Sequence, residues 1–118
     1  MPKVYVINKG CHDHSDAERF GELVFMSEGP INRYAVSRMY REFAHYLVDS
    51  HPEDYLLVTG LTIMVSVACV IFGRLHGRVN YLIYSPSRTP GEPGRYVERT
   101  IMVDELLKKG GDGNEESR

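Results

Sequence analysis

The segment between Asp54 and Tyr84 constrains the fold of this chain more than any other part of the sequence. It contains three apolar runs, separated first by Thr59-Gly60-Leu61-Thr62 and then by His76-Gly77. Runs of strand length on either side of a run of helix length are typical of a β-α-β unit in a parallel sheet. The predicted elements are a strand over residues 55–58, a helix over residues 62–76 that ends at Gly77, and a strand over residues 79–84.

The same segment has no charged residue from Tyr55 to Gly73, and about 20 apolar residues are enough to span a membrane. A spanning helix is nevertheless disfavoured, because Gly60 interrupts the run and the hydroxyl groups of Thr59 and Thr62 would need partners in lipid. A buried strand and a buried helix account for the run at lower cost. We therefore expect no contact with a membrane.

Weaker apolar patterns complete the alternation of strands and helices. They predict a strand at Val4–Ile7, a helical turn at Ala17–Gly21 capped by Ser15 or Asp16, a strand at Leu23–Met26, a helix at Ile31–Asp49 opened by Pro30, and a last strand at Arg95–Val103. The last strand is expected to form a hairpin across the proline- and glycine-rich loop 85–94. The expected fold is α/β, three-layer and Rossmann-like, with a mainly parallel sheet and an antiparallel C-terminal edge strand. We expect one domain over residues 1–107 and a disordered polar tail over residues 108–118.

Composition narrows the class of protein. The 118 residues suit one domain, and the formal net charge of -2 gives no general attraction to long nucleic acid. The two cysteines, Cys11 and Cys69, form neither a CxxC pair nor a zinc-finger pattern, and no signal peptide precedes the first strand. We therefore expect a reduced, cytoplasmic protein. The sequence has no glycine-rich dinucleotide fingerprint and no Walker A loop, so no cofactor is expected.

Short polar segments follow the first three predicted strands. In a parallel sheet these segments lie together at the carboxyl edge, where open α/β sheets bind ligands. Lys9 offers a cation for a phosphate, Glu28 offers a carboxylate for a ribose hydroxyl or a base, and the helix start after Gly60 offers N–H groups for an anion. Each segment also has a purely structural interpretation as a turn or a helix cap. The candidate ligand-binding residues are Asn8, Gly10, Ser15, Ser27, Glu28, Thr59, Gly60, Leu61, Thr62 and Arg95.

The loop after the first predicted strand carries two histidines and two aspartates, in the order His12-Asp13-His14-Ser15-Asp16. The H-x-H-x-D spacing resembles the metal-ligand motif of metallo-β-lactamase-type hydrolases, in which these side chains hold zinc. The chain is short for that fold, and the further ligands have no evident counterparts. Two alternatives remain: a solvated loop that caps the next helix, and a ligand-contacting loop whose imidazoles donate to phosphate or act as acid or base.

A family resemblance joins several of these features. Three segments in this order resemble the C-terminal half of CRISPR-associated Rossmann-fold (CARF) domains. They are Val58-Thr59-Gly60-Leu61-Thr62, the apolar helix ending in Arg74-Leu75-His76-Gly77-Arg78, and, after a strand and a proline-glycine loop, Arg95-Tyr96-Val97-Glu98. The layout is similar to that of the small, single-domain ring nucleases of type III CRISPR systems. The resemblance covers residues 55–103, and its motifs are short.

The resemblance implies a homodimer that binds a cyclic oligoadenylate across its two-fold axis. The binding loops would be Asn8–Ser15 and Thr59–Thr62. It also implies metal-free cleavage, in which a ribose 2′-hydroxyl is oriented in line with its neighbouring phosphate and the developing charge is stabilised. Lys9, His12 and His14 are the candidate catalytic residues, as stabilising groups or as the base.

Four functions remain open at this stage. The leading hypothesis is a dimer that binds a cyclic oligonucleotide second messenger, with cleavage of the bound ring left open. A second is a non-catalytic protein that sequesters such a signal, as phage anti-defence proteins do. A third is a metal-dependent hydrolase built on His12, His14 and Asp16, and a fourth is an interaction module that uses its apolar and tyrosine-rich helices for assembly.

Overall fold

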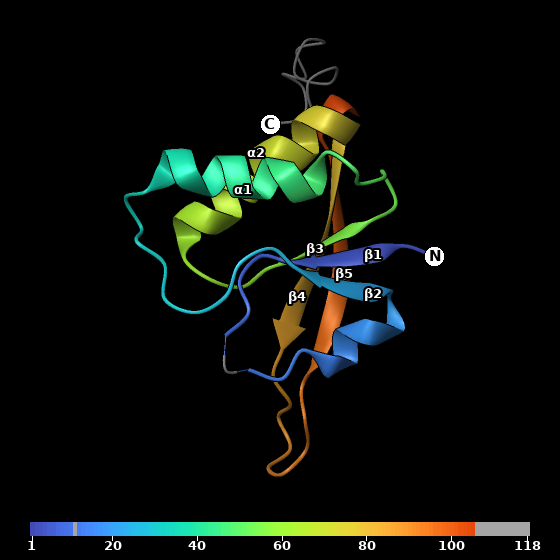
Figure 1. Cartoon of the computed structure of the whole chain (residues 1–118). Coiled ribbons are helices and arrows are strands. Elements are labelled where there is room, and N and C mark those ends of the chain that lie inside the picture. Colours follow the sequence, from blue (N-terminus) through green and yellow to red (C-terminus); the bar gives the residue numbers. More distant parts are fainter. Residues whose placement is uncertain (11, 106–118) are drawn as a thin grey trace, which may run out of the picture.

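The computed structural model describes residues 1–10 and 12–105, in which one sheet of strands is flanked by helices (Figure 1). The elements in chain order are β1 (Lys3–Val6), the 3-10 helix η1 (Ser15–Arg19), β2 (Glu22–Phe25), α1 (Val36–Leu47), β3 (Tyr55–Leu57), α2 (Thr62–His76), β4 (Arg78–Ser85) and β5 (Arg95–Met102). The predicted order of strands and helices is confirmed. The expected polar tail lies outside the described residues.

The five strands form one sheet in the order β2-β1-β3-β4-β5. The first four strands are parallel, and β5 runs antiparallel to β4. The α/β class, the mainly parallel sheet and the antiparallel C-terminal edge strand are therefore confirmed. The predicted hairpin is also confirmed, and its register places Tyr84 opposite Tyr96.

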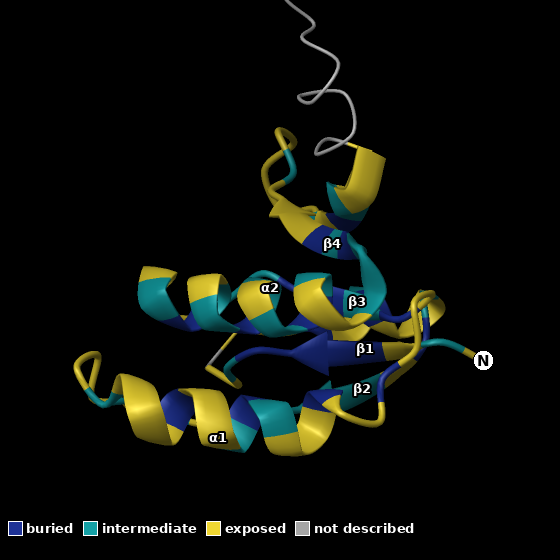
Figure 2. Cartoon of the chain, turned by 90° about the horizontal axis from the view of Figure 1, so that it is seen from above, coloured by how far each residue is buried: buried dark blue, intermediate teal, exposed yellow. Residues whose placement is uncertain are grey.

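Helices cover the two faces of the sheet unequally. In Figure 1, α1 and α2 lie together on one side of β1 and β2, whereas the short η1 lies on the other side. Figure 2 shows β1 coloured as buried along most of its length, and only its first residue, Lys3, is exposed. Alternate residues of β1 serve the two cores, because successive side chains of a strand point to opposite faces. Tyr5 packs with Phe43, Met64 and other residues of α1 and α2, and Val6 packs in the η1-side core.

The predicted helix 62–76 is confirmed at both ends. Gly77 ends α2 in the left-handed conformation with φ of 69°, and its N–H donates to the carbonyl of Gly73 at 2.8 Å. A residue with a Cβ would be strained at that φ, which explains the glycine. Leu61 is the N-cap and supplies no side-chain cap, so neither Thr59 nor Thr62 caps the helix. Within the described residues, no helix is both long and apolar enough to cross a membrane.

The predicted start of the α1 helix is wrong by five residues. The helix begins at Val36 rather than Ile31, and Pro30 does not open it. Asn32 holds the preceding chain in a turn, because its side-chain oxygen accepts from the Tyr34 N–H at 2.9 Å and its carbonyl accepts from the Ala35 N–H at 3.1 Å. Such local bonds compete with helix formation. The cap predicted for the first helical turn is also wrong, because His14 precedes η1 and neither Ser15 nor Asp16 caps it.

Candidate functional site

The carboxyl ends of β1 and β3 form a topological switch point. From β1 the chain passes through η1 on one face of the sheet to reach β2, whereas from β3 it passes through α2 on the opposite face to reach β4. Two adjacent parallel strands therefore send their following loops in opposite directions. Open α/β sheets bind ligands in the crevice that such a divergence creates.

A cavity of about 330 Å³ lies beside this switch point. Its lining comes from the loop after β1, the end of β3, and the paired ends of β4 and β5. The lining residues are His12, Asp13, His14, Val58, Thr59, Tyr84 and Tyr96. The volume falls in the range of small-molecule sites, which combine apolar walls with a few polar groups.

Tyr96 of β5 organises the wall of this cavity. Its hydroxyl shares a hydrogen bond of 2.9 Å with Nδ1 of His14, its N–H donates to Oδ2 of Asp16 at 2.7 Å, and its carbonyl accepts from Nη2 of Arg19 at 2.7 Å. The bond from the Tyr96 N–H lowers the pKa of the Asp16 carboxyl. Three hydrogen bonds thus attach the connection between β1 and β2 to Tyr96 of β5, which lies about 80 residues further along the chain.

His14 is buried, with 6% of its surface exposed. Burial lowers the pKa of its imidazole, and the nearby like charge of His12 and of Lys9 lowers it further. The ring is therefore neutral at neutral pH. Its Nε2 has no hydrogen-bond partner among the described residues. A buried polar group without a partner costs about 1–3 kcal/mol.

Polar groups of different character surround the opening. His12 and Asp13 are exposed, and Oδ1 of Asp13 accepts from the Ser15 N–H at 2.9 Å, which lowers the pKa of Asp13. The Lys9 ammonium lies 5.0 Å from the centre of the Phe25 ring, a cation–π contact. Tyr84 keeps 48% of its surface exposed and is available for stacking.

A second group of predicted site residues holds the loops together instead of facing the cavity. Nδ2 of Asn8 donates to the Gly29 carbonyl at 3.1 Å, and the Ser27 hydroxyl donates to the Ile7 carbonyl at 2.7 Å. A Cβ added to Gly60, where φ is +97°, would lie 3.0 Å from Cβ of Asn8. Asn8, Ser27 and Gly60 therefore form a packed junction between the ends of β1, β2 and β3.

The cavity brings together only part of the predicted set. His12, His14 and Thr59 line it, whereas the other candidate ligand-binding residues and Lys9 do not. Gly10, Ser15, Glu28, Thr62 and Arg95 are exposed elsewhere, and Leu61 packs against the core on the α2 side.

Four lining residues were absent from the predicted set. Asp13 lay within the histidine loop, and Val58 ended a predicted strand. Tyr84 and Tyr96 were detectable in the sequence, since they flank the proline-glycine loop and the predicted hairpin pairs them.

The side chains of the H-x-H-x-D motif face different partners. His14 is bonded to Tyr96, and Asp16 is bonded to both Tyr96 and Arg19. No group of three potential metal ligands occurs in residues 1–10 and 12–105. The described geometry therefore gives no support to a zinc site built on His12, His14 and Asp16.

Comparison with known proteins identifies a family without assigning an activity. No curated protein and no solved structure matches the chain. One family model, described as the phage Pam3 gp32-like protein, matches residues 2–99, which include all of β1 to β4 and the Tyr96 wall of the cavity. This match spans most of the 118 residues. The chain belongs to the phage Pam3 gp32-like protein family.

Proposed function

We propose that this protein binds a cyclic oligonucleotide signal, of the cyclic oligoadenylate class, in the cavity at the β1/β3 switch point. The observation that carries the proposal is the cavity itself, placed at the divergence of two parallel strands and lined by two tyrosines, two histidines, a threonine, an aspartate and a valine. The sequence resemblance to CARF domains supplies the ligand class. A homodimer that holds one ring between two such cavities is part of the proposal.

The ligand chemistry follows from the lining. The exposed Tyr84 offers a ring for stacking on a base, and Thr59 and His12 offer hydrogen bonds to sugar or phosphate oxygens. Lys9 lies over Phe25 outside the cavity lining, and its charge contributes to the lowered pKa of His14, so the cation acts on the histidine side of the cavity. A single lysine and an exposed histidine suit one or two phosphates better than a long nucleic acid.

Capture without cleavage is the form of this function that the geometry favours. His14 is buried and bonded to Tyr96, so it is poorly placed to exchange protons with a ligand. The family is named after a phage protein, and sequestration of an immune signal is a chemistry that suits a phage. Metal-free cleavage is the second candidate, because His12 is exposed, lines the cavity and is available as a general base.

The test is a calorimetric titration of the purified protein with cyclic di-, tri-, tetra- and hexa-adenylate, in a buffer that contains a metal chelator. Ion-exchange chromatography of the same mixtures separates intact rings from linear products. We expect saturable binding of one ring with one ring per two chains, and intact ring after incubation. Linear products that disappear in His12→Ala would instead support the cleaving form.

A matched pair of variants links binding to the cavity. Tyr84→Ala removes the stacking ring and is expected to weaken binding by about tenfold or more, since base stacking on an aromatic side chain contributes about 1–3 kcal/mol. Tyr34→Ala removes a tyrosine that is 85% exposed and does not line the cavity, so its affinity should match that of the unmodified protein. Absence of binding to every ring, or equal loss in both variants, would contradict the proposal.

A further inference from the structure

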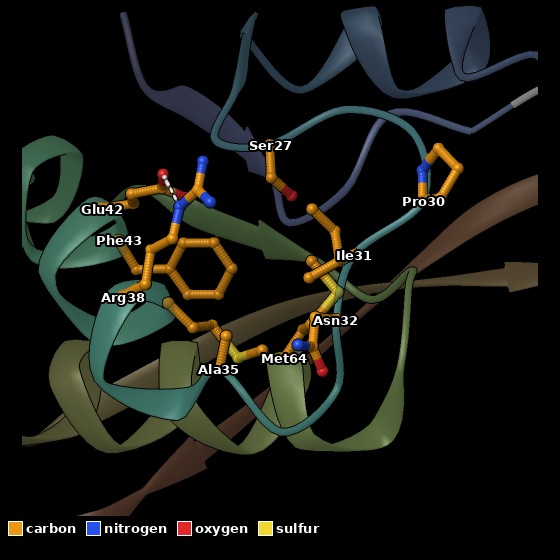
Figure 3. Close-up of a pocket in the computed structure, with 10 residues that line it drawn as sticks. Ser27, Pro30, Ile31, Asn32, Ala35, Arg38, Glu42, Phe43 and Met64 are labelled. Atoms are coloured by element: carbon orange, nitrogen blue, oxygen red, sulfur yellow. Dashed lines mark hydrogen bonds and ion pairs between the residues drawn. The ribbon is translucent and has the colours of Figure 1, made fainter.

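A second pocket lies on the opposite face of the sheet, beneath the loop that precedes α1 (Figure 3). Its volume is about 120 Å³. It is lined by Ser27, Pro30, Ile31, Asn32, Ala35, Arg38, Met39, Glu42, Phe43 and Met64. None of these residues lines the switch-point cavity, so the two sites are separate.

The floor of this pocket is apolar. Figure 3 shows Phe43, Ile31 and Met64 converging on its centre from α1, the loop and α2. Phe43 and Met64 are buried, and Met39 beside them is 3% exposed. An apolar cavity of about 150 Å³ is large enough to bind benzene, so this one suits a somewhat smaller apolar group such as a branched alkyl chain.

The mouth of the pocket presents an oriented arginine. Nε of Arg38 donates to Oε2 of Glu42 at 3.2 Å, as the dashed line in Figure 3 shows, and both residues line the pocket. The terminal nitrogens of the guanidinium make no hydrogen bond to the described residues, and the side chain is 80% exposed. A guanidinium presented in this way can bind a carboxylate through two parallel hydrogen bonds.

A wider groove of about 520 Å³ continues from this mouth and shares Ser27, Ile31, Arg38 and Glu42 with the pocket. Its charged lining residues are Arg38 and Arg41 against Glu28 and Glu42, with His45 beside them. The formal charges of the two arginines and two glutamates cancel. Such a balance gives no net attraction to a polyphosphate or a nucleic acid backbone, so a single carboxylate would depend on the local guanidinium of Arg38.

The loop over the pocket is the segment in which the helix prediction failed. The sequence favours a helix from Ile31, yet Asn32 holds the chain in a turn and α1 begins at Val36. The non-helical chain carries Pro30 and Ile31 over the first turn of α1, and both line the pocket. A local departure from sequence preference at a cavity is typical of a functional site.

We propose that this pocket and its mouth bind a small carboxylate that carries a short apolar group, with the apolar group between Phe43 and Met64 and the carboxylate on Arg38. The proposal is independent of the function assigned to the switch-point cavity. Ser27 lines the pocket and also bonds to the end of β1, so the pocket borders the loop junction that Asn8 and Gly60 complete.

The test uses 4-methylpentanoate as the probe and 4-methylpentanamide as its uncharged analogue. Ligand-observed NMR with the full-length protein gives both dissociation constants. We expect the carboxylate to bind at about 1 mM, as a ligand of eight non-hydrogen atoms with ordinary efficiency does. The amide is expected to bind about tenfold more weakly, because it lacks the charge-assisted bond to Arg38.

Three variants locate the binding. Ala35→Leu fills the pocket and should abolish binding, and Arg38→Gln should remove the preference for the carboxylate. Arg33→Gln changes an exposed arginine that lines neither pocket nor groove and should leave both constants unchanged. The far-ultraviolet circular dichroism of each variant verifies folding, and Ala35→Val replaces Ala35→Leu if the latter unfolds.

Three results would overturn the proposal: no saturable binding of the carboxylate up to tens of millimolar, equal affinity for acid and amide, or unchanged binding in the folded pocket-filling variant.

Discussion

Replacing Tyr96 with Phe tests the central claim about the switch-point cavity, that Tyr96 and His14 act as one buried hydrogen-bonded unit. Phe keeps the ring that packs with Val6, Leu57 and Leu82, so no cavity is created. The variant loses the 2.9 Å bond between the Tyr96 hydroxyl and Nδ1 of His14. Nε2 of His14 has no partner among the described residues, so both ring nitrogens are then without one. A lost bond together with a stranded buried acceptor or donor costs about 2 kcal/mol.

The double substitution makes the argument quantitative. In a His14→Phe background both ring nitrogens are gone, so removing the Tyr96 hydroxyl strands nothing and the cost of Tyr96→Phe should fall to about 0.5 kcal/mol or less. The expected coupling free energy is therefore about 1.5 kcal/mol, which is well above the limit for independent sites.

Urea unfolding followed by circular dichroism measures all four proteins, and the slope of the free energy against urea should be the same in each. Tyr84→Phe is the control, since its hydroxyl accepts only an exposed 3.2 Å bond from Gly94 and its loss should cost little. Additive costs for Tyr96→Phe and His14→Phe would refute the reasoning.

Three further predictions follow from single features. Burial lowers the pKa of His14 and of His76, so the unfolded chain takes up protons at a higher pH than the folded protein does. The free energy of unfolding should therefore be constant above about pH 6.5 and should fall as the pH drops from there through the lowered pKa values of the folded protein. Urea titrations at pH 7 and pH 5 measure this loss, which should be smaller in His14→Phe. Gly60→Ala should lower the melting temperature more than Gly91→Ala, since both glycines have positive φ but only Gly60 also meets Asn8; equal shifts would contradict this. Asn80→Ala should lower the free energy of unfolding by about 3 kcal/mol, because the buried amide donates to the carbonyls of Pro52 and Asp54 at 2.7 Å and accepts from Arg78. A loss below about 1 kcal/mol in chemical denaturation would show that water replaces the Asn80 side chain in these hydrogen bonds.

The local elements of the fold were predictable because their signals lie in adjacent residues. The α2 helix has a long apolar run and a terminal glycine, and the β4–β5 hairpin has a loop rich in proline and glycine between two strand patterns. The start of α1 was not predictable from periodicity, because the side chain of Asn32 competes with the helix for backbone donors.

The site was only partly predictable, because its walls come from residues that strand order brings together. The parallel strands predicted that the segments after β1 and β3 share one edge of the sheet, and His12, His14 and Thr59 from these segments line one cavity. Strand order decides which loops are neighbours, and it depends on long-range packing that leaves no local pattern. For that reason Asn8, Ser27 and Gly60 could not be separated beforehand as a structural junction, and Tyr96 could not be recognised as the residue that joins the cavity to η1.

The bonds from Asp16 and Arg19 to the main chain of Tyr96 also affect the edge of the sheet at β5. An edge strand with free N–H and C=O groups is open to pairing with another chain. On β5, side chains already occupy both main-chain groups of Tyr96, and Arg99 donates to the carbonyl of Glu98 at 2.7 Å. A second molecule cannot extend the sheet along this part of β5 without displacing them. Pairing along this part of β5 is therefore disfavoured for the homodimer in the proposed function, and the same bonds make this part of the edge a poorer template for stacking of strands from other copies.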